Sequence, residues 1–261
     1  MTKTQGCVIS TGGASFHFDN RYNGSNIMIK RITKQFNKAC VDYRLLADGD
    51  KILVGLSGGK DSLMLLQLLA ERSRIYKPEF SVEAVHVVMD NVPYLSDMDF
   101  LNDFCASLGV TLNVIHALFD DDSPKSKCFL CSWNRRKAMF QYAVTNGFNK
   151  VALGHHQDDI LATLFMNMTF AGNVSTMSPL MLMEHYDLSI IRPLCLVKED
   201  DIREFALSQM WKEQTRKCPY EEDTQRKHVG CVLQQMLAIS PEVRYNLWRS
   251  VEKVWERGTT L

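Results

Sequence analysis

The residues best suited to chemistry form a short loop rich in glycine and hydroxyl groups. Ser57-Gly58-Gly59-Lys60-Asp61-Ser62 follows the apolar run Ile52–Leu56 and precedes a leucine-rich segment that extends to about Arg72. The flanking segments predict a buried parallel strand and a helix. Glycine lets a phosphate approach the backbone closely, and the free N–H groups at the start of a helix face such an anion. The loop therefore predicts a phosphate site, to which two serines add hydroxyl groups and a lysine adds positive charge.

The spacing of this loop excludes the Walker A motif, which would need glycine at Val54 and Ser or Thr at Asp61. A plain glycine turn capped by Ser62 is the alternative without chemistry. The six residues 57–62, placed between a strand and a helix, resemble the SGGxDS loop of the PP-loop ATP-pyrophosphatase superfamily. The resemblance implies that ATP binds here and is cleaved between its α and β phosphates, with Lys60 and Asp61 as catalytic residues.

A second polar loop follows another short apolar run. Gly154-His155-His156-Gln157-Asp158-Asp159 comes after Val151–Leu153 and opens the next predicted helix. Aspartate is favoured at the start of a helix, so both Asp158 and Asp159 can act as caps. Carboxylates together with phosphate oxygens are also the usual ligands of ATP-bound Mg²⁺, and one aspartate can take each role. From this loop, the predicted ATP-binding residues are Gly154, His155 and Asp159.

Strand-like and helix-like segments alternate along the chain, which predicts a doubly wound parallel five-stranded α/β sheet. The predicted strands are Ile52–Leu56, Val82–Met89, Leu112–Leu118, Val151–Leu153 and Ile190–Leu194. In the common strand order 3-2-1-4-5, the order reverses between the first and fourth strands, and ligands bind beyond their carboxyl ends. The two polar loops follow these two strands. We therefore expect both loops to converge at one edge of the sheet, together with a cysteine pair that follows the third strand.

The predicted organisation is one nucleotide-binding domain with helical extensions at both ends. Its parts are an irregular arm over residues 1–24, the domain over residues 25–217, and a C-terminal loop with docking helices over residues 218–261. A hydrophobic content of 46% and 23% charged residues fit an ordinary globular fold. Two helix starts are predicted from local signals, one capped by Ser96 and one at about Ser132.

The pair Cys128-x-x-Cys131 is the second group that could do chemistry. Eight cysteines in a chain without a secretion signal favour metal binding or catalysis over disulfides. The pair alone is compatible with a redox centre, half of a zinc site or part of an iron–sulfur site. A zinc site could be completed by Cys218 with His228 or Cys231. Four cysteines lie in patterns that predict burial as small apolar residues: Cys40, Cys105, Cys195 and Cys231.

The net charge of +0 excludes a general attraction to nucleic acid, so RNA binding would need a local basic face. One candidate is Arg135-Arg136-Lys137, directly after the cysteine pair, and another is the basic amphipathic helix that begins at Ser25. Both are equally compatible with an ordinary solvated surface. No apolar run is long enough to span a bilayer, and we expect a cytoplasmic protein without a membrane partner.

Four motifs in the same order resemble those of the tRNA 2-thiocytidine biosynthesis family. They are Ser57-Gly-Gly-Lys-Asp-Ser62, Cys128-x-x-Cys131-Ser-x-x-Arg135-Arg136, Leu153-Gly-His-His-Gln-Asp-Asp-Ile-Leu-Ala-Thr-Leu-Phe-Met-Asn-Met168 and Ile191-Arg-Pro-Leu194. The resemblance covers about Asn26 to Cys218. It implies a fold of the adenine nucleotide alpha-hydrolase type and an ATP-dependent tRNA sulfurtransferase that acts on cytidine 32. In such a reaction, the C2 carbonyl oxygen of the base is adenylated and then replaced by sulfur.

The resemblance also implies the cofactors and partners. Cys128 and Cys131 would hold a 4Fe-4S cluster with Cys218 as the third ligand, although the family commonly has Cys-x-x-Cys where this chain has Cys218-Pro-Tyr-Glu221. ATP, Mg²⁺, tRNA and a sulfur donor such as a cysteine desulfurase would bind, and a homodimer is compatible. Two alternatives stay open. One is another PP-loop ligase that forms lysidine or thiouridine in tRNA, with structural zinc or idle cysteines, and the other is a non-catalytic nucleotide-binding module.

Overall fold

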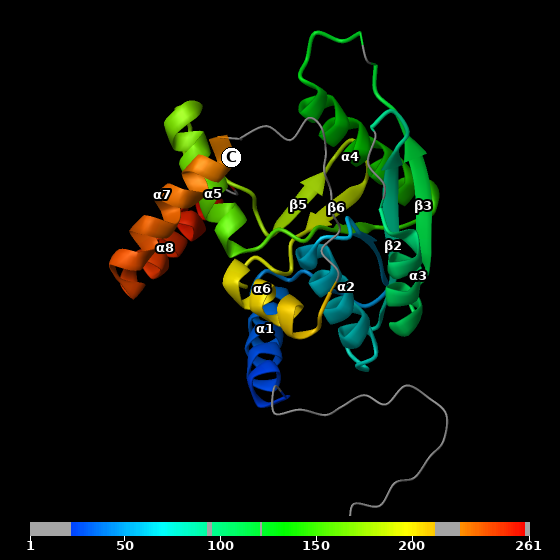
Figure 1. The fold of residues 1–261 in the computed structure, drawn as a ribbon, viewed down its shortest axis with the longest axis horizontal. Coiled ribbons are helices and arrows are strands. Elements are labelled where there is room, and N and C mark those ends of the chain that lie inside the picture. Colours follow the sequence, from blue (N-terminus) through cyan, green and yellow to red (C-terminus); the bar gives the residue numbers. More distant parts are fainter. Residues whose placement is uncertain (1–21, 93–95, 121, 212–224, 259–261) are drawn as a thin grey trace, which may run out of the picture.

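A six-stranded sheet forms the centre of the protein, which we describe from a computed structural model over residues 22–92, 96–120, 122–211 and 225–258 (Figure 1). The strands are β1 Asp50–Gly55, β2 Phe80–Met89, β3 Leu112–Ala117, β4 Lys150–Ala152, β5 Leu180–Met183 and β6 Leu188–Ile191. Their order across the sheet is β3-β2-β1-β4-β6-β5. The five predicted strands β1, β2, β3, β4 and β6 run parallel. The predicted order and its reversal between β1 and β4 are therefore confirmed.

The sheet has one strand more than the sequence analysis predicts. β5 pairs antiparallel with β6 in a hairpin, with Leu180 opposite Ile191. We expected a loop here because Gly172 and Pro179 break the pattern just before it. All four residues of β5 are apolar, yet Leu182 is 72% exposed. Neither an alternation of apolar and polar residues nor full burial marks this edge strand, so its sequence resembles no standard strand pattern.

Helices cover both faces of the sheet (Figure 1). They are α1 Tyr22–Asp42, α2 Lys60–Ser73, α3 Met98–Ser107, α4 Lys127–Thr145, α5 Gln157–Phe170, α6 Glu199–Ser208, α7 Gln225–Ile239 and α8 Pro241–Gly258. Alternate residues of β1 point to opposite faces: Ile52 packs in one core with α1, α2, α3 and α6, whereas Leu53 packs in another with α4. Within the described ranges, no helix combines the length and apolar character needed to cross a bilayer.

The C-terminal helices pack on α5 rather than on the sheet. Leu233 of α7 and Trp248 and Val251 of α8 share an apolar cluster with Ile160 and Leu161 of α5. The predicted loop around Cys218 and most of the predicted N-terminal arm lie outside the described residues. The three domain boundaries stay predictions.

Two helices start at residues other than those predicted. α3 is capped by Asp97, whose carboxylate accepts a hydrogen bond from the amide of Phe100 at 3.0 Å, so the predicted cap at Ser96 is wrong by one residue. Aspartate and serine cap equally well, and only the path of the chain decides between them.

The start of α4 matters more for function. Ser126 caps it and accepts a hydrogen bond from the amide of Phe129 at 3.3 Å. We predicted the start at about Ser132 because we read the cysteine pair as part of the preceding loop. Cys128 and Cys131 instead lie in the first turn of the helix, three residues apart and hence on one face.

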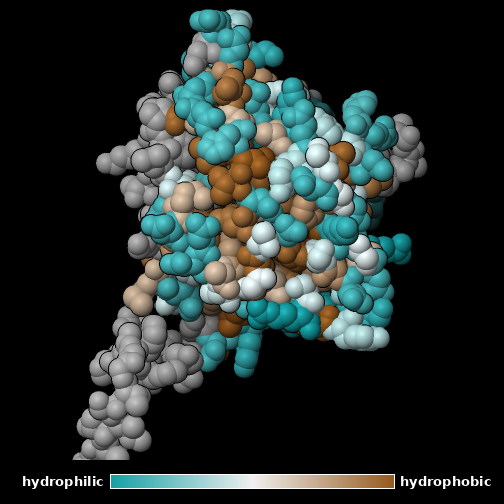
Figure 2. All heavy atoms as spheres, turned by 90° about the vertical axis from the view of Figure 1, so that its right-hand side faces the viewer, coloured by the Kyte–Doolittle hydropathy of each residue, from teal (hydrophilic) through white to brown (hydrophobic). Residues whose placement is uncertain are grey.

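The edge strand β3 is partly open to solvent. Figure 2 shows the molecule from the side on which β3 lies in Figure 1, and apolar side chains gather there among polar ones. Val114 of β3 is 43% exposed and Leu118, just beyond the strand, is 66% exposed. The sheet is thus well covered over β1 and β4, where the predicted site lies, and less so at its β3 edge.

A buried ion pair fixes the amino ends of β1 and β4. The side chains of Asp50 and Lys150 are 5% and 11% exposed, and Nζ of the lysine lies 2.6 Å from Oδ2 of the aspartate. Lys150 also donates to the carbonyl of Leu45 at 2.9 Å, and Asp50 accepts from the amide of Ala47 at 2.6 Å and from the side chain of Asn149 at 2.9 Å. This network sets the register of the two strands whose opposite ends carry the predicted site.

We expect Lys150→Met to destabilise the protein strongly, because it leaves the Asp50 carboxylate buried without its cation. Breaking one partner of a buried pair typically costs about 3–5 kcal/mol in the free energy of unfolding. The matched control is Lys38→Met, which removes an exposed pair with Asp42 and should cost about 0.5 kcal/mol or less. Urea unfolding of both variants measures the difference, and equal losses would contradict the structural role of the pair.

Candidate active site

The loop after β1 is closed by hydrogen bonds among its own residues. Gly58 has φ of +81°, a conformation that side-chain-bearing residues rarely adopt. The buried hydroxyl of Ser62 donates to the carbonyl of Gly59 at 2.9 Å and accepts from the amide of Ser57 at 3.1 Å. Ser57 Oγ in turn accepts from the amide of Gly59 at 3.3 Å. Ser62 therefore shapes the loop, while the loop itself stands at the start of α2, as predicted for an anion site.

Lys60 and Asp61 are the first residues of α2. Residues of a polar loop are expected to point into solvent, but these two side chains do not. They are only 28% and 29% exposed, and Lys60 Nζ lies 3.1 Å from Asp61 Oδ2 and 3.0 Å from Oε1 of Glu199. Glu199 begins α6, which lies far along the chain, so no local pattern could reveal this partner. The cation of the predicted phosphate site is held between two carboxylates.

The electrostatics of this pair follow from burial and its neighbours. Burial opposes charge on Lys60, but the carboxylates of Asp61 and Glu199 outweigh it and raise the pKa of the lysine. Burial also raises the pKa of Asp61, and the nearby His156 and Lys60 only partly offset this effect. Asp61 Oδ1 is buried without a hydrogen-bond partner among the described residues. A buried carboxylate oxygen of this kind is suited to a cation that the protein itself does not provide.

Gly154 allows the second loop to lie directly against the first. A Cβ atom at this position would lie 3.0 Å from the carbonyl carbon and oxygen of Asp61 and 3.1 Å from the amide nitrogen of Ser62. Any side chain would therefore press on backbone atoms, which cannot move aside without displacing the start of α2. The sequence analysis placed Gly154 at the site, and the structure supplies a steric reason for a glycine there.

Asp159 takes the capping role that the sequence analysis left open. His156 is the N-cap of α5: its Nδ1 accepts from the amide of Asp159 at 3.3 Å, and its own amide donates to Asp159 Oδ2 at 3.1 Å. His156 Nε2 lies 3.9 Å from Asp61 Oδ1, which links the two loops electrostatically. The carboxylates of Asp159 and Asp61 thus both lie beside Nε2 of one buried imidazole, with Asp159 Oδ2 at 3.4 Å. A role for Asp159 at ATP or Mg²⁺ stays a prediction.

Asp158 instead joins the second loop to two distant helices. Its carboxylate is buried, accepts from Arg244 of α8 at 2.7 Å, and accepts from the amide of Glu199 at 2.9 Å. Burial alone would raise the pKa of Asp158, but these hydrogen bonds outweigh it and lower the pKa. Glu199, which holds Lys60 through its side chain, is therefore positioned by Asp158 through its backbone. Sequence reasoning missed both Glu199 and Arg244, since neither belongs to a local motif.

Two cavities open beside these loops and share part of their lining. A cavity of about 200 Å³ reaches the phosphate loop at Ser57, and one of about 670 Å³ reaches Ser132 and Trp133 next to the cysteine pair. Both are lined by Arg135, Arg136, Leu153 and His155. The predicted ATP loop and the predicted metal helix therefore lie beside two neighbouring cavities that share a wall.

The larger cavity has an apolar wall and one buried cation. Met177, Met181 and Met183 contribute the wall, and Arg192 is 5% exposed. Arg192 donates to the carbonyl of Ser178 at 2.6 Å, its Nε has no hydrogen-bond partner among the described residues, and burial lowers its pKa to about 10. The sequence analysis quotes Arg192 in a motif but gives it no role. A single charged residue inside the apolar run at residues 190–194 could have indicated a buried functional cation.

The residues predicted to contact RNA lie around this space. Arg136 and Lys137 are exposed, whereas Arg135 is half-buried and lines both cavities. His86, which also lines the smaller cavity, is 2% exposed with Nδ1 2.8 Å from the carbonyl of Leu56, in keeping with the structural role its buried strand position suggests.

The cysteine pair has the position and exposure expected of two metal ligands. Cys128 is exposed, Cys131 is half-buried, neither is in a disulfide, and the two lie on one face near the start of α4. Helix N-termini favour the thiolate, which is the form that binds metal. Among the described residues, no three His, Cys, Asp or Glu side chains are grouped to hold an ion, and the predicted third ligand, Cys218, lies outside them. The pair can supply two ligands of a cluster, and completing it requires a residue from elsewhere.

The remaining cysteines separate into buried and exposed groups. Cys40, Cys105 and Cys195 are buried, as predicted, and burial raises the pKa of Cys40 to about 12 and that of Cys105 to about 11. The predicted burial of Cys231 is wrong: it lies on an exposed face of α7, as does His228. The apolar residues after Cys231 pack on α5 through Leu233, so the helix turns Cys231 outward.

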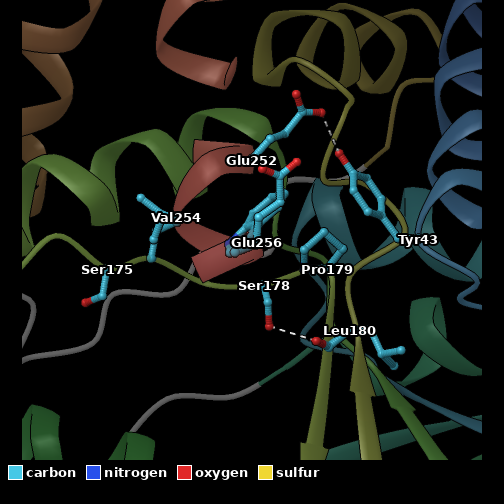
Figure 3. A pocket seen from close by; sticks show the side chains of 10 residues that line it. Tyr43, Ser175, Ser178, Pro179, Leu180, Glu252, Val254 and Glu256 are labelled. Atoms are coloured by element: carbon cyan, nitrogen blue, oxygen red, sulfur yellow. Dashed lines mark hydrogen bonds between the residues drawn. The ribbon is translucent and has the colours of Figure 1, made fainter. Parts of the chain in front are cut away.

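A third cavity, of about 660 Å³, lies away from the predicted site, between Tyr43, α8 and the segment that leads into β5 (Figure 3). The hydroxyl of Tyr43 donates to Glu252 at 3.2 Å across it, and Ser178 Oγ donates to the carbonyl of Leu180 at 2.8 Å. None of the residues predicted to bind ATP, metal or RNA lines this cavity. This cavity and the 670 Å³ cavity have nearly the same volume, so size does not decide which of them is the candidate site. We choose the 670 Å³ cavity because the second polar loop and the cations of α4 line it.

Comparisons with known proteins identify the family and the fold. The sequence matches the PP-loop domain family over residues 27–228. A tRNA-cytidine(32) 2-sulfurtransferase of Stenotrophomonas maltophilia is 35% identical over 215 residues, which cover 80% of this chain and 70% of that protein. The enzyme of the same name from Bordetella bronchiseptica is 32% identical over 241 residues, covering 90% and 74%. The solved structure of the U34-tRNA thiolase NcsA from Methanococcus maripaludis shares the fold, with a TM-score of 0.73 at 24% identity over 89% of this chain and 80% of that one.

We expect Gly154→Ala to push the two loops apart, because the new methyl group would overlap the backbone of Asp61. Overpacking of this kind typically costs about 1–3 kcal/mol, and the affinity for ATP should fall with it. Gly230→Ala is the matched control, since a Cβ there meets no atom within 4 Å and alanine favours the helix. Isothermal titration with a non-hydrolysable ATP analogue, with urea unfolding alongside, measures both effects. Unchanged affinity in Gly154→Ala would contradict the loop contact.

Proposed function

The chain belongs to the PP-loop family and, within it, to the tRNA-cytidine(32) 2-sulfurtransferases, and we propose that it replaces the C2 oxygen of a tRNA cytidine with sulfur at the expense of ATP. One observation carries the proposal. The cavity at the phosphate loop and the cavity beside the cysteine pair share Arg135, Arg136, Leu153 and His155. ATP activation and sulfur delivery must act on the same base, and two neighbouring cavities with a shared wall support this arrangement.

The reaction balances in two steps. The C2 carbonyl oxygen attacks the α-phosphate of ATP, and pyrophosphate leaves. Sulfide, as HS⁻, then attacks C2 and gives up its proton, the C–O bond breaks, and AMP leaves with the original oxygen. Both steps develop negative charge on phosphate oxygens, which positioned cations and amide groups stabilise.

The phosphate loop supplies those groups. Amides at the start of α2 face the phosphates, and Lys60 exchanges Glu199 for a phosphate oxygen when ATP binds. Mg²⁺ would be held by the phosphates with Asp61, whose Oδ1 has no hydrogen bond among the described residues, and with Asp159, whose carboxylate lies beside the same His156 nitrogen. A bound divalent cation would also keep Asp61 ionised despite its burial.

The larger cavity receives the base. Its methionine side chains offer a flexible apolar surface to the faces of the pyrimidine ring. The unpartnered Nε of Arg192 is a donor for an oxygen of the substrate, and the exposed Arg136 and Lys137 lie where the RNA backbone enters.

A 4Fe-4S cluster bound by Cys128, Cys131 and Cys218 would supply the site at which sulfur is carried. The position of the first two thiols at a helix N-terminus, next to the cavity, supports this role. A sulfur donor such as a cysteine desulfurase is then a required partner, because the chain itself provides no sulfur for turnover. A homodimer stays a prediction.

We expect Lys60→Met and Asp61→Asn to abolish thiolation while the protein stays folded, because both side chains are partly buried among polar groups and neither belongs to a hydrophobic core. The assay is thiocytidine in tRNA nucleosides by mass spectrometry, with purified chain, ATP and a sulfide source. Glu199→Gln should keep activity, since it releases Lys60 without removing it. Asp200→Asn, which alters the exposed neighbouring pair with Arg203, is its control. Normal activity of Lys60→Met would rule out the phosphate-loop role.

Single Cys→Ser variants at 128, 131 and 218 should lose both the cluster and the thiolated product. Cys231→Ser is the matched control, because Cys231 is an exposed free thiol on α7. The measurement is bound iron and sulfide after anaerobic reconstitution, with thiocytidine as the second readout. Loss of iron in Cys231→Ser, or zinc as the native metal, would contradict the three-cysteine assignment.

The substrate itself is tested in cells that lack the gene. Nucleoside mass spectrometry should show that thiolated cytidine disappears from tRNA and returns with the wild-type gene, but not with Lys60→Met. Unchanged thiocytidine, with loss of a thiouridine or of lysidine instead, would assign the chain to another tRNA-modifying activity of the same fold.

A further inference from the structure

Two aromatic rings stand exposed beside the cysteine pair. Phe129 and Trp133 are one turn apart on α4 and are 46% and 54% exposed. Their ring planes are within 9° of parallel and their centroids are 6.5 Å apart. Residues four apart on a helix share a face, so the two rings form one surface. We propose that this surface, the Phe129–Trp133 platform, stacks unpaired bases of the RNA next to the reacting cytidine.

The platform is continuous with the proposed active site. Trp133 lines the 670 Å³ cavity, and Phe129 lies one turn farther toward the start of α4. A cytidine that enters this cavity leaves the stack of its own loop, and its neighbours lose a stacking partner. Aromatic side chains at the mouth replace that partner, which is how proteins commonly hold splayed-out bases. The inference therefore rests on the proposed function and specifies how its substrate is held.

The charges around the platform favour RNA over a protein partner. α4 contains four basic residues and no acidic one. Lys125 Nζ lies 5.3 Å from the centre of the Phe129 ring, and Arg136 and Lys137 are exposed on the following turn. The cations can bind the phosphates of an RNA strand while the aromatic rings between them stack on its bases. A second copy of this chain, which carries the same positive helix, is a poorer match.

The test is binding of a tRNA anticodon stem-loop to the full-length protein with its cluster reconstituted, in the absence of ATP. Phe129→Ala and Trp133→Ala should each weaken binding by about 5- to 160-fold, the range for loss of one stacked base. Phe129→Tyr and Trp133→Phe should bind like the wild type, which also guards against misfolding of the alanine variants. Tyr76→Ala is the matched control, because Tyr76 is 83% exposed with Lys77 Nζ 5.4 Å from its ring, and it lies elsewhere.

The salt dependence separates stacking from charge. Phe129→Ala should leave the slope of log K against log salt unchanged, whereas Lys137→Met should reduce it by about 0.7 for one single-stranded phosphate contact. Replacing the loop nucleotides one at a time by abasic sites should locate the stacked base. For the stem-loop that lacks this base, Trp133→Ala should not weaken binding any further. Tryptophan fluorescence that the stem-loop quenches in the wild type but not in Trp133→Phe gives a direct signal of contact.

The outcomes distinguish the platform from the proposed function. Wild-type RNA affinity in both alanine variants, with thiolation intact, would overturn the platform and leave the function standing. Weakened binding of the alanine variants, with no thiocytidine made by the wild type, would overturn the function and leave the platform standing. If the alanine substitutions alter sedimentation of the protein and not RNA binding, the surface is a contact between copies of the chain and the proposal fails.

Discussion

The site depends on one close approach of two backbones, where Gly154 lies against the amide of Ser62 and the carbonyl of Asp61. Parallel strands that are adjacent in a sheet bring their carboxyl ends to the same edge, but they do not by themselves bring the following loops into contact. The contact here needs a residue without a side chain after β4 and a tight, glycine-containing turn after β1. The Asp50–Lys150 pair at the other end of the same two strands fixes their register. The register of β1 and β4 is fixed at their amino ends, and the steric fit of Gly154 against the phosphate loop is fixed at their carboxyl ends. Together these two constraints set the relative position of the two loops.

The charges of the site form a chain that extends beyond the loops. Arg244 of α8 binds Asp158, Asp158 binds the backbone of Glu199, and the side chain of Glu199 binds Lys60. Each contact is made by a residue from a different part of the sequence. Arg244 therefore connects α8, which contributes nothing to the sheet, to the position of the lysine in the phosphate loop.

The fold was largely predictable because its signals are local. Each parallel strand is a short apolar run, each polar loop follows such a run, and the order of the strands follows from a common topology. The errors arose where the signal was not local. β5 is an edge strand that only its partner β6 defines, and Cys231 lies in α7, whose buried face is determined by its packing on α5. The start of α4 was displaced because Ser126 and Ser132 are equally plausible caps in the sequence.

The same distinction explains what the sequence revealed of the site. The phosphate loop, the second loop and the cysteine pair were found from residue type and spacing. Glu199 and Arg244 were missed because their partners lie far away in the chain. Arg192 was quoted only as part of a motif and was given no role. An ion pair between distant elements leaves no local pattern in the sequence, whereas a helix start or a glycine turn does. Sequence reasoning thus identifies the groups that touch the substrate more readily than those that orient them.

The position of the cysteine pair inside a helix has a consequence for recognition. A rigid helical turn presents Cys128 and Cys131 at a fixed distance from Arg135, one turn further along, which lines both cavities. Had the pair been in a flexible loop, it could have moved to meet a base still stacked in the RNA. In the proposed reaction, a fixed pair requires the base to come to it, which corresponds to RNA that extrudes a nucleotide into a confined space. Recognition then rests on the shape and flexibility of an unpaired loop rather than on reading a helix groove, since A-form RNA hides its base edges in a deep, narrow groove. A protein with no net charge can bind RNA in this way, because it needs cations only along the short stretch of backbone that surrounds the extruded base.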